Sequence, residues 1–503
     1  MRAQRTQAGQ RISLAELFPA EILGESDADL LVTGIQLDSR RVGPGDLFVA
    51  VTGYRDDGSR YIDKAVERGA VAIAVDAEIV KNLEQQSVPL IAVVDLKKQV
   101  SSIAGRFYGD PSRQLEVIGI TGTNGKTSCC QFIAKAFTHL GIQCGVIGTI
   151  GYGLVDALQK TDNTTPDAVA MQRMLAQMVD QHFDAVALEV SSHGMDQGRV
   201  QGVAFDTVVF TNLTRDHLDY HGDMESYAAS KAALFFLPGI KHAVINLDDA
   251  YGRSLMEQLP DSIACYGYSV GDHDAALSVT SLEYSSHGIK ASLRTPWGEG
   301  ILASSLLGRF NLENLLVVVA VLCAQGVSLD RALAAVSKLD GVPGRMQRFG
   351  GNGMPLVVVD YAHTPDALKS VLMVLRELGT GEVWCVFGCG GDRDQGKRAL
   401  MGEVAEQLAD TLVLTNDNPR GEEPRQIIRD IEAGLRKPGK AIVELDRSKA
   451  IQLAVRNAGP QDLVLIAGKG HEDYQEIKGA RRAFSDAEQV RQALNIKRLT
   501  DED

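Results

Sequence analysis

The stretch GITGTNGKTSCC, Gly119–Cys130, decides the fold of this chain. It follows the apolar run Glu116–Thr121, which predicts a strand, and it leads into a segment that predicts a helix from about Lys126. A glycine loop between a strand and a helix is typical of a phosphate site, because its N–H groups and the helix dipole both favour an anion. The common pattern G-x-x-x-x-G-K-[ST] is not kept, since Ile120 stands where the first glycine belongs. The sequence therefore predicts a phosphate-binding loop of unusual spacing.

The segments that follow this loop predict a parallel sheet. Near-continuous apolar runs recur, mostly separated by helical stretches, at Gly145–Ile150, Phe183–Val190, Phe205–Leu213 and His242–Asp249. Such strands are typical of a sheet that is covered on both faces. Residues 263–305 change to short alternating strands with glycine turns, which predict an antiparallel patch. The apolar segment Asn314–Gly326 is shorter than the ~18 residues of a bilayer span and predicts a buried helix.

Two turn-rich stretches, Tyr108–Gln114 and Asp340–Pro355, predict linkers between three domains. Before the first linker, short apolar runs and a helical stretch at Tyr61–Arg68 predict a small α/β domain. After the second linker, apolar runs alternate with helices, which predicts a Rossmann-like, doubly wound sheet. These runs are Leu356–Tyr361, Val383–Gly388, Thr411–Asn416, Ala441–Leu445 and Asp462–Gly468. We therefore predict an α/β protein with domains at residues 1–111, 112–343 and 344–503, the central one built on a mostly parallel P-loop-type sheet.

Composition narrows the classes of partner. The net charge of −14 argues against nucleic acid or an anionic membrane, because either needs a basic face. Seven scattered cysteines do not form a disulfide framework, and Cys385 and Cys389 lack a second pair that would complete a zinc site. The N-terminus has no apolar signal region. We expect a monomeric cytoplasmic protein that binds small molecules.

Several residues point to phosphoryl chemistry. Lys126 is expected to reach the β- and γ-phosphates, and Thr127 to offer its hydroxyl to Mg²⁺. Glu189 ends an apolar strand at the edge where open α/β sheets bind ligands, so it would bind Mg²⁺ with Thr127. The alternative for Glu189 is a surface carboxylate. For Lys231 the sequence alone indicates only a solvated lysine on an amphipathic helix.

The loop T-G-T-N-G-K-T resembles that of the Mur ligase family, ATP-dependent enzymes of bacterial cell-wall and peptidoglycan synthesis, and folylpolyglutamate synthetases have a related loop. Further motifs match the family in order: Leu188–Gly194, Thr211–Phe235, Gly308–Leu316, Gly341–Arg348 and Val359–Leu368. Three others, Asn163–Pro166, Asp417–Arg420 and Gly468–Gln475, resemble the subfamily that adds the third peptide residue. The resemblance covers essentially the whole chain.

The resemblance implies a ligase that joins meso-2,6-diaminopimelate to UDP-N-acetylmuramoyl-L-alanyl-D-glutamate. ATP phosphorylates the carboxylate, the amine attacks the acyl phosphate, and ADP and phosphate are released. Mg²⁺ is the implied metal, with Thr127, Glu189, His217 and Lys231 near it and Lys231 carbamylated. His217 and His221 are also four residues apart, but no zinc-protease glutamate lies between them, which favours magnesium over zinc.

The resemblance also implies three sets of binding residues. The implied ATP contacts are Gly122, Thr123, Asn124, Gly125, Lys126, Thr127, Ser128, Asn311, Arg345, Asp360 and His363. The implied contacts of the UDP-muramyl dipeptide are Leu37, Ser39, Tyr54, Arg55, Asp56, Asn163, Thr164, Thr165, Ser191, Gln197 and Arg199. The implied diaminopimelate contacts are Arg393, Asp417, Asn418, Pro419, Arg420, Gly468 and Glu472.

The sequence gives weaker support to other functions. A ligase adding L-lysine lacks a use for Arg420, because lysine has no distal carboxylate, and a folylpolyglutamate-synthetase-like ligase is the second alternative. An NAD-dependent oxidoreductase is disfavoured because Arg393 stands where the third glycine of G-x-G-x-x-G belongs. A nucleotide switch does not account for the motifs after residue 344.

Overall fold

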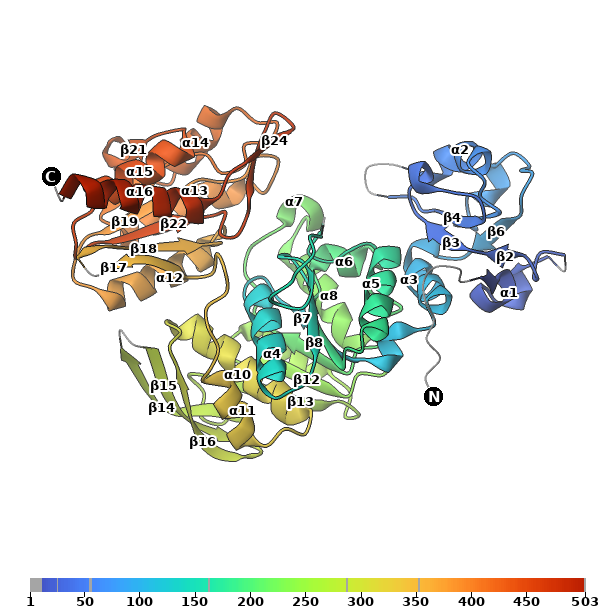
Figure 1. The fold of residues 1–503 in the computed structure, drawn as a ribbon, viewed down its shortest axis with the longest axis horizontal. Coiled ribbons are helices and arrows are strands. Elements are labelled where there is room, and N and C mark those ends of the chain that lie inside the picture. Colours follow the sequence, from blue (N-terminus) through green and yellow to red (C-terminus); the bar gives the residue numbers. More distant parts are fainter. Residues whose placement is uncertain are drawn as a thin grey trace.

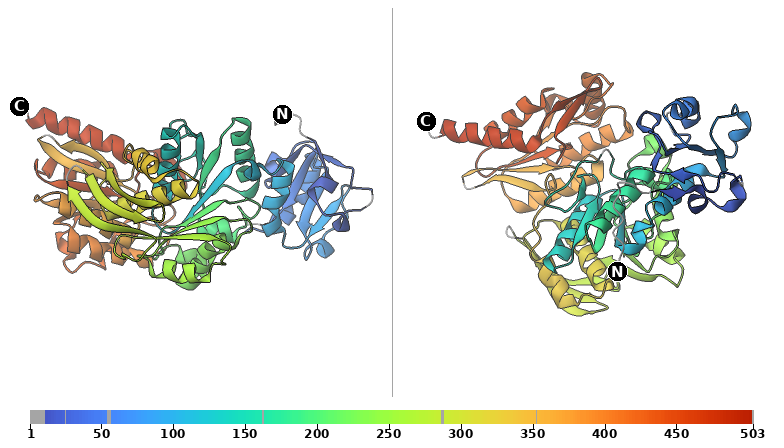
Figure 2. Two further views of the ribbon diagram at one scale, coloured as in Figure 1. Left: turned by 90° about the horizontal axis from the view of Figure 1, so that it is seen from below. Right: turned by 45° about the vertical axis from the view of Figure 1, so that its right-hand side comes forward.

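The computed structural model describes residues 11–24, 26–53, 57–161, 163–285, 288–351 and 353–501. Three lobes follow one another along the chain, each built on its own sheet (Figure 1). The lobe in the middle of the sequence also lies between the other two in space (Figure 2). The mostly parallel α/β class that the sequence predicts is confirmed. The predicted domain boundaries fall between the three main sheets and stay a prediction.

The N-terminal lobe is a four-stranded parallel sheet in sequential order with helices on both faces. Its strands are β3 Gly34–Gln36, β4 Asp46–Ala50, β5 Ala72–Asp76 and β6 Leu90–Val93, and a small pair is formed by β1 Ile12–Ser13 and β2 Leu31–Val32. Its helices are α1 Leu14–Leu17, α2 Ile62–Glu67 and α3 Leu96–Phe107, with 3₁₀ turns η1 Ala20–Ile22, η2 Ser39–Arg41, η3 Gly58–Tyr61, η4 Val80–Asn82 and η5 Pro111–Gln114.

The central lobe is a ten-stranded sheet in the order β16-β15-β14-β13-β12-β11-β7-β10-β8-β9. Its strands are β7 Glu116–Thr121, β8 Cys144–Ile147, β9 Tyr152–Gly153, β10 Ala185–Glu189, β11 Thr207–Phe210, β12 His242–Asn246, β13 Ala264–Ser269, β14 Leu277–Ser285, β15 Gly288–Thr295 and β16 Gly298–Ser304. Its helices are α4 Lys126–His139, α5 Ala168–Asp180, α6 Ser192–Asp196, α7 Leu218–His221, α8 Met224–Ala232, η6 Ala233–Phe236, α9 Ala250–Gln258, α10 Arg309–Ala324 and α11 Leu329–Val336.

Two predictions in this lobe have different outcomes. The apolar segment Asn314–Gly326 lies mostly within α10, whose residues Leu315–Leu322 have no exposed surface, so a buried helix is confirmed. No helix of the described residues is long and apolar enough to cross a membrane. The antiparallel patch expected at residues 263–305 is only partly correct, because β13 and β14 continue the sheet in parallel from β12 and only β14–β16 are antiparallel.

The C-terminal lobe is a six-stranded sheet in the order β17-β18-β22-β19-β20-β21, parallel except for β17, with helices on both faces. Its strands are β17 Gln347–Gly351, β18 Met354–Asp360, β19 Val383–Phe387, β20 Thr411–Leu414, β21 Ile442–Val443 and β22 Leu463–Ala467, and a hairpin is formed by β23 Tyr474–Ile477 and β24 Ala480–Ala483. Its helices are α12 Pro365–Leu378, α13 Gly396–Leu408, α14 Pro424–Glu432, η7 Pro438–Lys440, α15 Arg447–Asn457 and α16 Asp486–Asp501.

The second linker was predicted too long. Residues 347–351 pair with β18 as an edge strand, and the register shifts between Gly350 and Gly351, which both adopt left-handed conformations. The doubly wound prediction is confirmed. After β19 the chain runs through α13 to β20, whereas after β22 it runs to α16, which contacts β17 and β18 on the other side. The chain thus leaves these two neighbouring strands in opposite directions, so a ligand crevice is expected at their carboxyl ends.

Candidate functional site

The phosphate loop follows β7, which lies between β10 and β11 inside the central sheet. Gly122 and Gly125 have φ of 145° and 88°, and Gly125 immediately precedes α4. A Cβ on Gly122 would lie 1.9 Å from the Thr211 hydroxyl, so no side chain fits there. At this spacing the loop packs against the end of β11. The N–H groups of Thr123 and Asn124 donate to the backbone carbonyl and the side-chain oxygen of Asn212, each at 2.8 Å, and the start of α4 favours an anion beside them.

Two lysines converge on this loop. Lys126 Nζ donates to the carbonyls of Gly122 and Thr123, each at 2.8 Å, and Lys231 Nζ donates to the Gly122 carbonyl at 2.8 Å. Lys231 is 1% exposed, so it is not the solvated lysine that the helix pattern allowed. Burial, with the nearby charge of Lys126, lowers the pKa of Lys231 well below its ordinary value. The side-chain nitrogens of both lysines thus meet at the Gly122 carbonyl of the loop.

Glu189 is buried at the end of β10 and faces this loop. Its Oε2 accepts from the hydroxyls of Thr127 at 2.9 Å and Thr149 at 3.0 Å, and its Oε1 accepts from the Thr149 N–H at 2.9 Å. At 2% exposure it is not a surface carboxylate. Arg345, from the segment before β17, donates to the Thr127 hydroxyl at 3.1 Å and lies 4.4 Å from the Tyr361 ring centre. The sequence offered no local signal for Thr149.

A buried carboxylate joins the two larger lobes. Asp216 is 3.5 Å from His217 Nε2, 3.6 Å from His363 Nε2 and 3.7 Å from Lys397 Nζ. Burial alone would raise the pKa of Asp216, but the hydrogen bond from His363 and the neighbouring cationic groups lower it well below its ordinary value. Burial lowers the pKa of His217 to about 3, so the ring is neutral at neutral pH. Sequence reasoning missed Asp216 and Lys397, although Asp216 lies within the family motif Thr211–Phe235 and Lys397 lies four residues after Arg393.

The predicted diaminopimelate residues gather at the carboxyl ends of β19, β20 and β22. Asn418 donates to Glu472 Oε2 at 2.8 Å and accepts from Lys469 Nζ at 3.0 Å, which also pairs with Glu472 at 2.7 Å. Arg420 has φ of 49° and donates to the Gly391 carbonyl at 2.8 Å. Gly468 packs on Asp417, since its Cβ would lie 2.6 Å from Oδ2. Lys469, which has no exposed surface, was missed.

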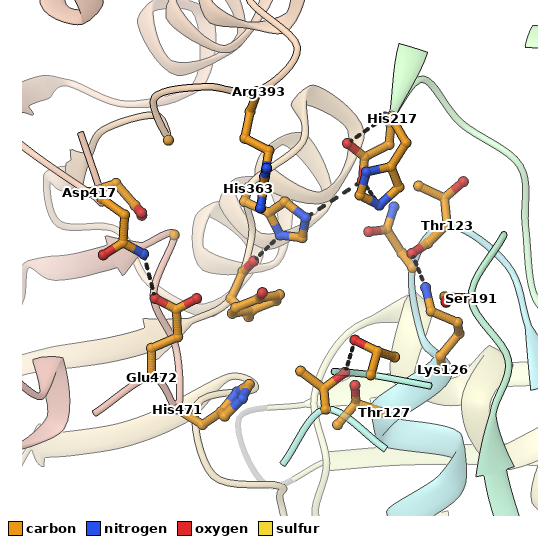
Figure 3. Close-up of a pocket in the computed structure, with 18 of the residues that line it drawn as sticks. Thr123, Lys126, Thr127, Ser191, His217, His363, Arg393, Asp417, His471 and Glu472 are labelled. Atoms are coloured by element: carbon orange, nitrogen blue, oxygen red, sulfur yellow. Dashed lines mark hydrogen bonds and ion pairs between the residues drawn. The ribbon is translucent and has the colours of Figure 1, made fainter. Parts of the chain in front are cut away.

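One cavity of about 720 Å³ collects these groups from both lobes (Figure 3). Among the predicted residues, it is lined by Thr123, Asn124, Gly125, Lys126, Thr127, Asn163, Thr164, Glu189, Ser191, His217, Lys231, Arg345, His363, Arg393, Asp417, Asn418, Arg420, Gly468 and Glu472. Ion pairs of Arg215 with Asp394 and of Lys160 with Asp473 bridge the lobes beside it. Lys126 and Glu472 thus face one space from different domains.

A second cavity of about 310 Å³ adjoins the first at Arg345, which lines both. Asn311 lines the second cavity and donates to the Leu307 carbonyl at 2.8 Å. Asp360 lines neither, because its carboxylate accepts the N–H groups of Met346 and Ala362, each at 2.7 Å, and so holds the segment that carries Arg345. Gly122, Ser128 and Pro419 do not line either cavity.

The predicted UDP-dipeptide residues are dispersed. Thr165 is buried and accepts from the Ser191 N–H at 2.9 Å, and Gln197 accepts from Arg199 at 2.6 Å. Leu37 and Ser39 lie at the end of β3 in the N-terminal lobe, away from both cavities. Tyr54, Arg55 and Asp56 lie outside the described residues.

Within the described ranges, no three His, Cys, Asp or Glu side chains gather as a metal site, and the seven cysteines are free.

Comparisons with known proteins agree on one family over most of the chain. The Mur ligase family catalytic domain matches residues 31–108, the Mur ligase middle domain residues 120–322, and the Mur ligase glutamate ligase domain residues 344–470.

Several relatives that are about half identical over nearly the whole chain carry one name. UDP-N-acetylmuramoyl-L-alanyl-D-glutamate–2,6-diaminopimelate ligase of Pseudomonas aeruginosa is 52% identical over 96% of this chain and 98% of its own length. The enzyme of that name from Ectopseudomonas mendocina is 51% identical over 94% and 97%. A solved structure of the same name is 37% identical, with a TM-score of 0.71 over 97% of this chain and 99% of its own. A Mycobacterium tuberculosis folylpolyglutamate synthase, solved with ADP, shares the fold at 19% identity, with a TM-score of 0.62 over 73% of this chain and 91% of its own. The chain therefore belongs to the Mur ligase family.

Proposed function

We propose that this chain is the ATP-dependent ligase that adds meso-2,6-diaminopimelate to UDP-N-acetylmuramoyl-L-alanyl-D-glutamate in peptidoglycan precursor synthesis. The observation that carries the proposal is the single cavity lined by Lys126 of the phosphate loop and by Asn418, Arg420 and Glu472 of the other lobe. An acyl phosphate formed at the loop would meet an incoming amine in that space. Relatives named for this reaction, about half identical over nearly the whole chain, support the same substrates.

The residues around the loop suit phosphoryl transfer from ATP. Lys126 would stabilise the charge on the transferred phosphoryl group, and Arg345 stands where the two cavities meet. We assign the adenosine end to the second cavity, beside Asn311, because a triphosphate on the loop would extend past Arg345 toward it. His363, which borders the first cavity, is assigned to the phosphate side.

The residues that line the cavity beside the phosphate loop also fit Mg²⁺. The Thr127 hydroxyl and the Glu189 carboxylate are hard oxygen ligands, which this ion prefers, and both line the cavity. The neutral ring of His217 and the side-chain nitrogen of Lys231 both lie beside the Tyr227 ring. A carbamate on Lys231 would therefore add an oxygen ligand beside His217. When bound, Mg²⁺ neutralises charge on the phosphate oxygens during transfer.

Lys231 is proposed to carry a carbamate, formed when its neutral amine attacks carbon dioxide and releases one proton. Burial favours the neutral amine that this reaction requires. Lys231→Ala is therefore expected to lose nearly all ligation, and added formate or acetate to restore part of it by supplying a carboxylate. ¹³C-NMR of enzyme equilibrated with labelled bicarbonate would detect the carbamate carbon. Lys241→Ala, at an exposed lysine, is the control, and an active enzyme without a carbamate signal would refute the assignment.

The other end of the acceptor is assigned to the N-terminal lobe. Leu37, Ser39 and residues 54–56 would hold the uridine diphosphate, while Asn163, Thr164 and Ser191 at the cavity wall would meet the glutamyl end. Thr165, Gln197 and Arg199 would shape that wall. We infer domains at residues 1–111, 112–343 and 344–503, and a monomeric cytoplasmic enzyme, which light scattering and cell fractionation would test.

The function itself is tested by substrate dependence. The purified chain should release ADP and phosphate in equal amounts, and only when the UDP-muramyl dipeptide and diaminopimelate are both present. Mass spectrometry should find the tripeptide product. A nucleotide switch would hydrolyse ATP without either substrate, a folylpolyglutamate synthetase would extend a folate with glutamate, and a lysine-adding ligase would prefer L-lysine, so each alternative has its own result.

A further inference from the structure

Arg398 lies next to the amino-acid end of the large cavity without lining it. It belongs to α13, and its side chain has no exposed surface. Its Nη1 donates to Glu422 Oε2 at 2.9 Å and to Asp430 Oδ2 at 2.7 Å, and its Nη2 donates to Glu422 Oε1 at 2.8 Å. Arg398 and Glu422 thus form a bidentate pair, the geometry in which guanidinium and carboxylate fix each other's orientation.

This pair binds two loops together. Arg398 Nη2 donates to the Gly390 carbonyl at 3.2 Å, and Glu422 Oε1 accepts from the Asp392 N–H at 2.6 Å. Asp392 Oδ2 in turn accepts from the Gly421 N–H at 3.0 Å. The loop after β19, residues 388–394, is therefore tied to the turn after β20, residues 417–422, through Arg398 and Glu422.

The two loops carry Arg393 and Arg420, which we assign to the distal carboxylate of diaminopimelate, because both line the cavity and a guanidinium fork pairs well with a carboxylate. The two loops are in close contact, because the Gly391 N–H donates to the Asn418 carbonyl at 2.9 Å and Arg420 donates to the Gly391 carbonyl at 2.8 Å. A Cβ on Gly391 would lie 2.0 Å from the Pro419 carbonyl oxygen. A shift of either loop would therefore change the spacing of the two guanidinium groups.

Only arginine can make these contacts together. Its planar fork reaches one carbonyl and two carboxylates at once, whereas a lysine ammonium keeps the charge but has no fixed fork. The hydrogen bonds from Arg398 lower the pKa of Glu422, so this carboxylate stays ionised at neutral pH and continues to hold the Asp392 N–H. The contact pattern thus depends on the shape of the side chain and not on its charge alone.

We propose that Arg398 is a positioning residue for amino-acid specificity, which holds Arg393 and Arg420 at the spacing that the distal carboxylate of diaminopimelate requires. The inference rests on the proposed function, because it assumes that this end of the cavity takes the amino acid.

Arg398→Lys tests the inference. Its KM for diaminopimelate is expected to rise roughly 10- to 100-fold, the effect of about 1 Å of misplacement. KM for ATP and for the UDP-muramyl dipeptide should not change, and the preference for diaminopimelate over L-lysine should fall by the same factor, because lysine has no distal carboxylate. A residue that only stabilised the fold would lower the melting temperature and the active fraction without changing this preference. Glu422→Gln, which keeps the side-chain shape, should change the preference in the same direction and decides the case if Arg398→Lys does not fold.

Arg376→Lys is the matched control. Arg376 donates to the Leu408 carbonyl at 2.8 Å and pairs with Asp410 at 2.7 Å, and Asp410 accepts from the Val383 N–H at 2.8 Å. Arg376 thus also joins a carbonyl to a carboxylate that holds a backbone N–H, although it pairs with one carboxylate and not with two. It lies at the opposite, amino-terminal edge of the same sheet, so amino-acid preference should stay at the wild-type value. If wild type prefers diaminopimelate and both network variants keep that preference, the inference is overturned. Wild type that does not use diaminopimelate would overturn the proposed function instead.

Discussion

Arg420→Ala is expected to lower kcat/KM for meso-diaminopimelate by roughly 30- to several-thousand-fold while KM for ATP stays unchanged. Truncating one partner of a desolvated charge pair costs about 2–5 kcal/mol, because the other charge remains buried and unpaired. Arg420 has a side chain only 19% exposed, lines the cavity and is held at φ 49° by the β23–β24 hairpin, whose Glu476 carbonyl accepts from its N–H. Its guanidinium is held at the cavity by the Gly391 carbonyl, to which Nη1 donates at 2.8 Å, and its Nε lies 3.9 Å from the Glu476 carboxylate.

Steady-state rates with diaminopimelate and with L-lysine, in wild type and mutant, measure this effect. Arg425→Ala is the control, because Arg425 is exposed at the start of α14 and lines neither cavity. A mutant with undiminished use of diaminopimelate would refute the role of Arg420, and a wild type that prefers lysine would refute the substrate. Neither result would affect the assignment to the family.

Lys126→Ala is expected to reduce ligation by roughly 10²- to 10³-fold, a loss of about 3–4 kcal/mol of transition-state stabilisation. The mutation removes the point charge that faces the transferred phosphoryl group, and the neighbouring Lys231, which is proposed above to carry a carbamate, would not supply another. Lys126 Nζ is held at the loop by two carbonyls of its own chain, so the charge is fixed where a phosphate would lie.

ADP release under saturating substrates checks the prediction, with the melting temperature recorded to confirm folding. Lys135→Ala on the same helix α4 is the control, since Lys135 lies more than two turns further on and lines neither cavity. Ligation by Lys126→Ala within about threefold of wild type would contradict a catalytic role, because removing such a contact costs far more.

Much of the fold could be predicted because the signals are local. The run Glu116–Thr121 forms β7 with the predicted bounds, and α4 begins at Lys126 as the glycine spacing predicts. A buried strand is a continuous apolar run in the sequence, whichever strand it pairs with. The strand at residues 347–351 was missed because an edge strand rich in glycine has no apolar run, and the β23–β24 hairpin was missed because its residues are partly or fully exposed.

The sequence by itself determined most of the buried elements, the phosphate loop and the family, because periodicity and motif spacing involve residues close together in the chain. Only the tertiary structure decided which distant groups meet. Thr149 reaches Glu189 because β8 pairs with β10, and Asp216 reaches Lys397 because the central and C-terminal lobes pack together. Arg398 reaches Gly390 and Glu422 because β19 pairs with β20. These contacts depend on strand order and domain packing, which leave no periodic pattern in the chain.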